Sequence, residues 1–458
     1  MSVVIFGAGL VTRPLVKYLC EKHFKVTVAS RTLSNAMELV VGCDPSIARA
    51  VQCDVTKDTE LANELIQQND VTISMLPYKY HKQLFMVCLE HKKHFLTTSY
   101  TQDFMYEYEK QIVESNMIVV NEAGLYPGLE TASIMKIVDA VHKDKGKIES
   151  LTTYCGGLPT PESNTNPLGY KFSWAPRGVL LAERNPATYL EHGEVVTLPT
   201  RQLVLDNKKA INVQELNKTF EGIANRDSLK FLKLYNIDSE ANTFIRGTLR
   251  YSGWSEIVSF FHSVDMFETD IDETLTNTMT YAQLLCYILS LDDTDMLPKY
   301  IECNYGKHID NVLRFLGFYD ETQYLITTKI DELTRLDVLA ALMKTKMCYT
   351  KGEHDMIPIV NQFVALYPNG TKSEITQSAV FYGNDQGTAM ENTVSLPVAV
   401  VAELILTKQF ATAGLHILNK QELYEPVLDL LVDKGYEFTT KTTNIHMAID
   451  MSSDVAVL

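Results

Sequence analysis

Glycines near the start of the chain predict a phosphate-binding turn. The apolar run Val3–Phe6 leads directly into Gly7-Ala8-Gly9, as a parallel strand does when it enters such a turn. Glycine lets the backbone pass close to a pyrophosphate, and the helix that follows offers unpaired N–H groups and the positive end of its dipole. The last small residue of the usual G-x-G-x-x-G pattern is Thr12 here. We therefore expect a bound dinucleotide, with Gly7, Gly9 and Thr12 at the turn.

An arginine at the end of the second predicted strand favours a phosphorylated dinucleotide. Enzymes that select NAD usually carry Asp or Glu at this point, where it accepts hydrogen bonds from the ribose 2′-OH. This chain has Arg31 instead, between the hydroxyls of Ser30 and Thr32. A guanidinium suits the 2′-phosphate of NADP, so we expect NADP(H) as the cofactor. The alternative is an ordinary solvated arginine.

Polar residues follow three further predicted strands. Asp54-Val55 would meet the adenine, with the carboxylate accepting from the amino group; the alternative is a turn aspartate. Ser74–Tyr78 and Thr97–Tyr100 should line the cofactor crevice, because the carboxyl ends of parallel strands meet at one edge. The Tyr100 phenol can transfer a proton or merely pack. Cys155, beside two glycines, reads from the sequence alone as a buried small residue.

Three arginines further along are candidates for binding carboxylates. Arg226, Arg246 and Arg250 stand in polar surroundings, and a substrate with several carboxylates needs such partners. Most arginines are surface residues, so each one alone is a weak signal. No metal site is expected: no two cysteines have C-x-x-C spacing, and His91 and His94 are not four residues apart.

The elements that must position these residues alternate between strand and helix over the first ~125 residues, which is typical of a doubly wound parallel sheet. The predicted strands are Val3–Phe6, Lys25–Ala29, Arg49–Gln52, Val71–Met75, His94–Thr97 and Ile118–Val120. Helical patterns lie between them, and Gln102–Ser115 is the last of these helices.

After Asn121 the pattern changes. A strand at Leu151–Tyr154 precedes a long Gly/Pro/Asn-rich loop, and a loop of that length in a compact enzyme is usually functional. Pro368-Asn369-Gly370 predicts a hairpin tip. The predicted later elements are helices at Asn277–Leu289, Ile330–Thr345, Val394–Thr407 and Glu422–Lys434, and a last strand at Tyr436–Thr440.

The composition excludes some classes of function. The 458 residues carry a net charge of -16, which argues against nucleic acid as a main partner. No apolar run approaches the ~20 residues of a membrane span, and the N-terminus lacks the pattern of a cleaved signal. Eight scattered cysteines fit a reducing, cytoplasmic compartment. We expect an enzyme without a structural metal and no membrane or nucleic-acid partner.

Taken together, these segments resemble the NADP-linked, L-glutamate-forming saccharopine dehydrogenase (saccharopine reductase) family along essentially the whole chain. The most specific run is Asn166–Trp174, which reads N-P-L-G-Y-K-F-S-W. The other segments that carry the resemblance are Gly7–Pro14, Ser30–Leu33, Ser74–Tyr78 with His81, Thr97–Tyr100, Asn121-Glu122, Tyr154–Glu162, Arg177–Leu181, Asn225–Ser228 and Arg246–Tyr251.

The resemblance implies a reaction and a fold. The reaction would be NADPH reduction of the imine of L-glutamate and α-aminoadipate semialdehyde to saccharopine, and its reverse, in lysine metabolism. The fold would be α/β, with a variant Rossmann domain (1–125 plus about 390–458). A mixed α/β substrate and dimerisation domain (126–260 plus about 346–389) and a mainly helical domain (261–345) would complete it. A homodimer is implied by the family.

The resemblance also assigns residues. The cofactor would be held by Gly7, Gly9, Leu10, Val11, Thr12, Ser30, Arg31, Thr32, Asp54, Val55, Leu76, Gly124, Leu125, Trp174 and Arg177. Substrate contacts would be made by Ser99, Tyr100, Tyr126, Arg226, Gly247, Thr248 and Leu249. Tyr100 and Cys155 fall on positions linked to the family's acid–base chemistry, which favours a catalytic role over simple burial.

One departure separates this chain from the family pattern. Where the family reads N-E-x-G-L-D-P-G-[IL]-D-H, the active-site Asp is Tyr126, the second Asp is Glu130 and the His is Thr131. Smaller departures are Ala224 for Pro and Ser395 for Gly. Because a tyrosine carries no full negative charge at neutral pH, three hypotheses stay open. They are an active saccharopine dehydrogenase in which Glu130 or Glu122 replaces that Asp, a related oxidoreductase with another imine or amino-acid substrate, and a non-catalytic NADP-binding homologue.

Overall fold

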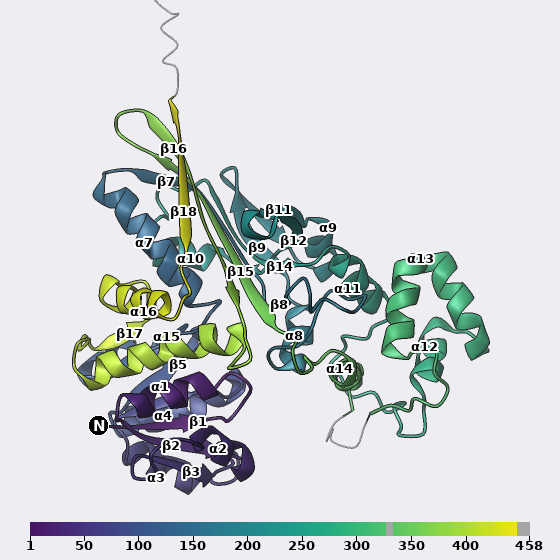
Figure 1. Ribbon diagram of the computed structural model, residues 1–458, viewed down its shortest axis with the longest axis horizontal. Coiled ribbons are helices and arrows are strands. Elements are labelled where there is room, and N and C mark those ends of the chain that lie inside the picture. The colour runs from purple at the N-terminus through teal and green to yellow at the C-terminus, as the bar shows by residue number, and fades with distance from the viewer. Residues whose placement is uncertain (327–332, 447–458) are drawn as a thin grey trace, which may run out of the picture.

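The computed structural model describes residues 1–326 and 333–446. Two β-sheets form its body, one of seven strands and one of eleven, and Figure 1 shows the smaller sheet at the N-terminal end of the molecule. The long strands of the larger sheet lean away from it, and α12–α14 make a separate helical lobe at the far side (Figure 1). The predicted α/β fold class with a helical insert is confirmed.

The smaller sheet is parallel, with strand order β17-β6-β5-β4-β1-β2-β3. Its strands are β1 (Ser2–Phe6), β2 (Lys25–Ser30), β3 (Ala48–Gln52), β4 (Val71–Ser74), β5 (His94–Thr97), β6 (Ile118–Val120) and β17 (Gly414–His416). The six predicted strands are confirmed to within one residue at each end. The chain runs outward from β1 on one side and from β4 on the other, so a switch point lies between β1 and β4, where such sheets bind ligands.

Helices cover both faces of this sheet. They are α1 (Arg13–Glu21), α2 (Leu33–Val40), α3 (Thr59–Gln67), α4 (His81–Glu90) after the short η1 (Tyr78–Tyr80), α5 (Phe104–Glu107), α6 (Glu109–Glu114), α15 (Ala389–Leu406) and α16 (Gln421–Asp433). The single helix predicted over Gln102–Ser115 is wrong, because the chain breaks at Tyr108 into α5 and α6. α15 lies against α1, and the Tyr18 hydroxyl donates to Glu403.

The larger sheet is mixed and runs β10-β9-β14-β7-β15-β16-β18 along its main path. Its strands are β7 (Lys147–Cys155), β8 (Leu158–Pro159), β9 (Ala187–Glu191), β10 (Glu194–Leu198), β11 (Lys209–Val213), β12 (Lys218–Ala224), β13 (Arg226–Asp227), β14 (Thr243–Arg250), β15 (Asp355–Leu366), β16 (Thr371–Tyr382) and β18 (Thr439–His446). The predicted hairpin joins β15 to β16, with Gly370 at a positive φ of 80°.

The C-terminal strand corrects one predicted boundary. The sequence predicts that residues from about 390 to 458 belong to the dinucleotide-binding part and that the last strand spans Tyr436–Thr440. Instead β18 begins at Thr439 and pairs antiparallel with β16 in the larger sheet. The reason is β16 itself, whose unpaired edge needs a partner for its N–H and C=O groups. Residues 447–458 of that predicted segment lie outside the described residues.

The remaining helices belong to the larger sheet and the helical lobe. They are α7 (Leu129–Lys143), α8 (Pro176–Ala182), α9 (Arg201–Asp206), η2 (Gln214–Leu216), α10 (Leu229–Leu234), α11 (Trp254–Ser263), α12 (Tyr281–Leu289), η3 (Thr294–Met296), α13 (Leu297–Leu316) and α14 (Arg335–Lys346). Gly306, at a φ of 85°, interrupts α13. The helix predicted over Ile330–Thr345 corresponds to α14, and its residues 330–332 lie outside the described residues.

One hydrophobic core joins the two sheets. It runs from Val3 and Ile5 of β1 through α1, α15, α16 and α7 to Ile359 and Phe363 of β15. A second core fills the other face of the larger sheet and the helical lobe, and a third lies under α3 and α4. Within the described residues, α15 is the one helix long and apolar enough for a membrane span, but 78% of it is buried as the centre of the shared core.

Candidate functional site

The glycine turn after β1 is shaped to approach a ligand with bare backbone. Gly7 has a φ of 112°, and a Cβ there would lie 3.0 Å from the carbonyl carbon of Met75, so a side chain is excluded. At Gly9 nothing lies within 4 Å of an added Cβ, which leaves open space beside the backbone. Thr12 is fully buried, and its Oγ1 has no hydrogen-bond partner among the described residues. These features fit a pyrophosphate group.

The residues expected at the 2′-phosphate lie together on the surface. Arg31 follows β2, is exposed, and forms no ion pair with any described residue. The Ser30 hydroxyl accepts from the amide of Thr32 (3.2 Å), which orders the turn around it. Leu10, 65% exposed, also leaves its side chain open to a ligand. This cationic, uncompensated turn fits a phosphate.

The expected adenine and nicotinamide neighbours show mixed arrangements. Asp54 accepts from the amide (3.0 Å) and hydroxyl (2.7 Å) of Thr56, which hold the pKa of its carboxyl below the usual value. That contact matches the alternative of a turn aspartate, and the adjacent Val55 is buried. Leu76 is held from behind, because its carbonyl accepts from His81 Nε2 (3.0 Å).

Two other expected cofactor contacts differ in their availability. Arg177 Nε donates to Asp337 of α14 (2.6 Å), so its charge is already partnered, whereas Trp174 is only partly buried.

Gly124 and Leu125 form a tight turn with Gly128. A Cβ on Gly128 would lie 2.3 Å from the carbonyl oxygen of Gly124, so the turn depends on glycine.

Tyr100 lies beyond the end of β5 and is ringed by positive charge. Its hydroxyl is buried and has no hydrogen-bond partner among the described residues. The Lys230 amine lies 4.9 Å from the centre of its ring, and the guanidinium carbons of Arg226 and Arg246 lie 5.6 Å and 5.9 Å away. Burial raises the pKa of Tyr100, so the phenol is protonated at neutral pH. A proton donor thus stands among three cations.

Arg246 of β14 is buried and its charge is compensated. Its Nη2 donates to Glu130 at the start of α7, and Glu130 also accepts the Gly128 amide at its other oxygen (2.7 Å). The guanidinium stacks on Phe231 (3.8 Å) and lies over the Tyr126 ring (4.6 Å). The sequence indicated Arg246 only as one of three arginines and gave no sign of this pair, whose members are 116 residues apart.

Tyr126 and Cys155 complete this cluster as neutral groups. The Tyr126 hydroxyl donates to the carbonyl of Thr153 (3.3 Å), and burial raises the pKa of this tyrosine well above its ordinary value. Cys155, at the end of β7, is buried as the sequence alone favours, and burial raises the pKa of its thiol. A protonated thiol is a poor nucleophile, so Cys155 is suited to a supporting contact.

The remaining expected substrate contacts offer backbone rather than side chains. Gly247 packs against Tyr154, whose ring would lie 2.4 Å from an added Cβ. Leu249 is fully buried, and Thr248 pairs in register with Cys155. Ser99 uses its carbonyl to accept the Glu122 amide (2.9 Å). Arg250 turns away, since it pairs with Glu183 (3.5 Å) in a separate buried network.

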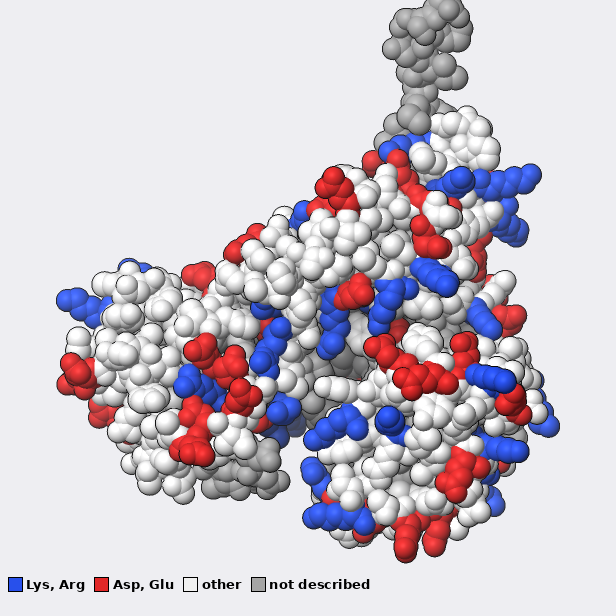
Figure 2. Space-filling view, turned by 180° about the vertical axis from the view of Figure 1, so that it is seen from behind, with Lys and Arg blue, Asp and Glu red and all other residues white. Residues whose placement is uncertain are grey.

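The surface of the molecule has a hollow that is bordered by charged side chains (Figure 2). Figure 2 shows the hollow between the lobe of the parallel sheet and the rest of the molecule, with several Lys and Arg and some Asp and Glu side chains on its rims. The net charge of the whole chain is -16, so this concentration of cations is local. It would attract an anionic ligand to the hollow.

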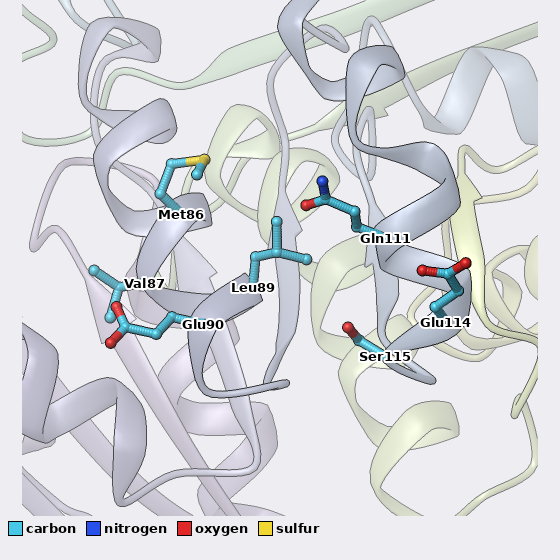
Figure 3. Close-up of a pocket in the computed structure, with 7 residues that line it drawn as sticks. All are labelled: Met86, Val87, Leu89, Glu90, Gln111, Glu114 and Ser115. Carbon is cyan, nitrogen blue, oxygen red and sulfur yellow. The ribbon is translucent and has the colours of Figure 1, made fainter.

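A cavity elsewhere has no matching chemistry. About 480 Å³ in volume, it lies between α4 and α6, lined by Met86, Val87, Leu89, Glu90, Gln111, Glu114 and Ser115 (Figure 3). These residues lie at the C-terminal ends of α4 and α6. The cavity is therefore at the edge of the sheet where the strands begin, opposite the glycine turn. Among the described residues no group of three or more His, Cys, Asp or Glu could hold a metal ion.

A parallel sheet with a glycine turn, joined to a second sheet that carries a cluster of cations, defines a two-domain dinucleotide-binding protein of the α/β class. Residues 3–120 match the family model described as saccharopine dehydrogenase NADP binding domain. Residues 124–436 match that described as saccharopine dehydrogenase C-terminal domain. The chain belongs to the saccharopine dehydrogenase family.

Named relatives cover the chain almost completely. Saccharopine dehydrogenase (NADP(+), L-glutamate-forming) of Saccharomyces cerevisiae is 34% identical, over 94% of this chain and 97% of that one. The Schizosaccharomyces pombe enzyme of the same name is 33% identical over 95% and 97%. Alpha-aminoadipic semialdehyde synthase, mitochondrial, of Bos taurus is 33% identical, but the match spans 48% of it. The solved apo yeast saccharopine dehydrogenase superimposes with a TM-score of 0.85, covering 96% of this chain and 99% of that one.

Proposed function

We propose that this protein is an NADP-dependent saccharopine dehydrogenase that forms L-glutamate. In one direction it reduces the imine of L-glutamate and α-aminoadipate semialdehyde to saccharopine; in the other it oxidises the secondary amine of saccharopine, and water releases the two products. The observation that carries the proposal is the cluster of a protonated Tyr100 with Arg226, Lys230 and Arg246 beyond the carboxyl end of β5. A substrate with three carboxylates needs several cations and one proton donor in such a place.

The cofactor residues fit NADP(H). The bare backbone at Gly7 and Gly9 would take the pyrophosphate, and exposed Arg31 with Ser30 and Thr32 would take the 2′-phosphate. When bound, the nicotinamide accepts or supplies the hydride. Leu76, held by His81, and the Gly124-Leu125 turn would border its ring.

The chain's own residues then bind substrate and move protons. Arg226 and Lys230 are exposed, so they can each bind a substrate carboxylate, whereas Arg246 is already paired with Glu130 and ties β14 to α7. The Tyr100 hydroxyl, which has no partner among the described residues, would donate a proton to the reacting nitrogen, or to the hydroxyl group that leaves as water when the imine forms. Neutral Cys155 and Tyr126 would border the substrate without adding charge.

A steady-state assay tests the proposal. NADPH consumption should require both α-aminoadipate semialdehyde and L-glutamate, and NADP+ reduction should follow addition of saccharopine. The absence of turnover in both directions, from protein that still binds NADPH, would refute it.

A second candidate is a related oxidoreductase that acts on another imine or amino acid. The favouring observation is Tyr126, whose uncharged ring packs on the Arg246 guanidinium. Thermal shifts measured across a panel of amino acids distinguish the two, since stabilisation by saccharopine alone would count against the second candidate. In addition, Tyr126→Asp should raise saccharopine turnover strongly if Tyr126 impairs this reaction, and lower it if Tyr126 has been recruited to another substrate.

The proposal extends to assembly and location. We infer a homodimer formed through the substrate part of the chain, residues 126–260 and 346–389, following the division proposed from the family. Light scattering coupled to size-exclusion chromatography would test it. A cytoplasmic location is supported by the eight cysteines, all of which are free. Cell fractionation tests it directly, because the bovine relative is named as mitochondrial.

A further inference from the structure

The buried carboxylate of Glu122 belongs to a residue that contacts both neighbours of Tyr100 in the sequence. Glu122 follows β6, is 1% exposed, and adopts a left-handed backbone with a φ of 56°. Its amide donates to the carbonyl of Ser99 (2.9 Å), and its Oε1 accepts from the amide of Thr101 (3.0 Å). The two bonded residues are the immediate neighbours of Tyr100, so Glu122 holds the turn on both sides of that tyrosine.

Besides the Glu122 contacts, the Ser99 amide donates to the hydroxyl of Thr97 (3.3 Å). Tyr100 lies beyond the end of β5, outside any helix or strand, and its hydroxyl has no partner among the described residues. Its ring meets the edge of Phe231 at 6.3 Å between centroids. The position of the phenol therefore depends on the backbone of residues 99–101 and on the cations packed over its ring, and the Glu122 contacts hold that backbone on both sides.

The conformation of Glu122 is costly and calls for a functional explanation. A non-glycine residue with positive φ is uncommon, and its backbone is strained. Its Oε2 is buried without a partner among the described residues, and burial raises the pKa of this carboxyl. Strained backbone and unpaired buried polar atoms gather at functional sites, where the surrounding structure holds them for a purpose.

We propose that Glu122 is a positioning residue for Tyr100: the carboxylate–amide bond to Thr101, with the backbone bond to Ser99, holds the phenol against the substrate. The inference rests on the proposed function, because it takes Tyr100 as the group that donates to the reacting atoms. In this role Glu122 makes no ionic contact with the substrate. The position therefore requires a side-chain oxygen that accepts a hydrogen bond, and not a negative charge.

Three variants test the assignment. Glu122→Ala removes the acceptor, Glu122→Gln keeps an acceptor without the charge, and Glu107→Ala removes an exposed carboxylate from the segment that follows the same turn. Glu122→Ala should lower kcat with saccharopine about 10²-fold, the scale of a small misplacement of a reacting group. The KM for NADP+ should stay within about twofold, because that site is on the other side of the switch point. Glu122→Gln should recover to within about fivefold of wild type, and Glu107→Ala should match wild type.

A second readout does not depend on turnover. Hydrogen exchange at the Thr101 amide should accelerate in Glu122→Ala and stay slow in Glu122→Gln. Glu122→Leu replaces the alanine variant should that protein fail to fold, since it fills the space without an acceptor. Wild-type kcat in the alanine or leucine variant, or a glutamine variant as slow as either, would overturn the proposal. A wild-type protein without saccharopine turnover would refute the proposed function, while the exchange rates would still decide whether Glu122 holds the turn.

Discussion

The two sides of the crevice are built differently. On the cofactor side, Arg31 and Leu10 are exposed and the backbone of the glycine turn is open. The positive charge of Arg31 is therefore accessible to a ligand. On the substrate side, Arg246 and Glu130 are buried together, and Tyr126 packs over the guanidinium. The contrast teaches that removal of an exposed side chain such as Arg31 should alter ligand affinity alone, whereas changes in the Arg246 pair should also alter the stability of the fold.

The largest effect should come from breaking the buried pair. Arg246→Met leaves Glu130 as a buried carboxylate without its cation, which typically costs about 3–5 kcal/mol of stability. Urea unfolding measures the loss. The double variant Arg246→Met/Glu130→Gln should regain most of it, and an Arg246→Met protein as stable as wild type would erase the proposed contrast.

Arg31→Ala should give the opposite pattern. Loss of a guanidinium–phosphate contact should raise the KM for NADP+ by about 10²-fold and leave the KM for NAD+ unchanged. Unfolding by urea should be unaffected, because Arg31 is exposed and forms no ion pair with any described residue. Equal effects on the two cofactors would place the 2′-phosphate elsewhere.

His81 is the buried exception on the cofactor side. Burial lowers its pKa from 6.5 to about 4, so the unfolded chain binds a proton between these values that the folded protein does not. Its contribution to stability is present above pH 6.5 and is lost as pH falls toward 4, by about 2 kcal/mol at pH 5. His81→Gln should lack this portion of the acid destabilisation. Parallel wild-type and variant curves from pH 7 to pH 4.5 would show that His81 is not neutral in the fold.

The smallest effect should follow Tyr126→Phe. The ring keeps its place over Arg246 while the bond to the Thr153 carbonyl (3.3 Å) is lost, at a cost of about 1 kcal/mol. Thermal unfolding with and without saccharopine checks this. A loss as large as that of Arg246→Met would mean that the hydroxyl, not the ring, holds the substrate side together.

The strands and turns of the cofactor side could be predicted because their determinants are local. Gly7, Gly9 and Arg31 follow strands whose apolar runs mark them, and parallel strands bring their carboxyl ends to one edge whatever lies between. The same argument correctly put Tyr100 at that edge. The same argument does not tell which arginines are available to a ligand. Arg177, which is expected at the cofactor, is bound to Asp337, and Arg250 is paired with Glu183.

The substrate side could not be predicted in the same way, because its partners come from distant elements. Arg246 on β14 meets Glu130 on α7, and Glu122 after β6 meets Thr101 after β5. Polar pairs of this kind carry no periodicity, and only the fold brings them together. β18 is misplaced for the same reason. It follows α16 in the sequence, but its pairing with β16 puts it in the larger sheet.

The most direct test of the account is product analysis of saccharopine oxidation by the wild-type protein with NADP+. We predict L-glutamate and α-aminoadipate semialdehyde in amounts equal to the NADPH formed. NADPH formed from another amino acid but not from saccharopine, or lysine and 2-oxoglutarate as the products, would contradict it.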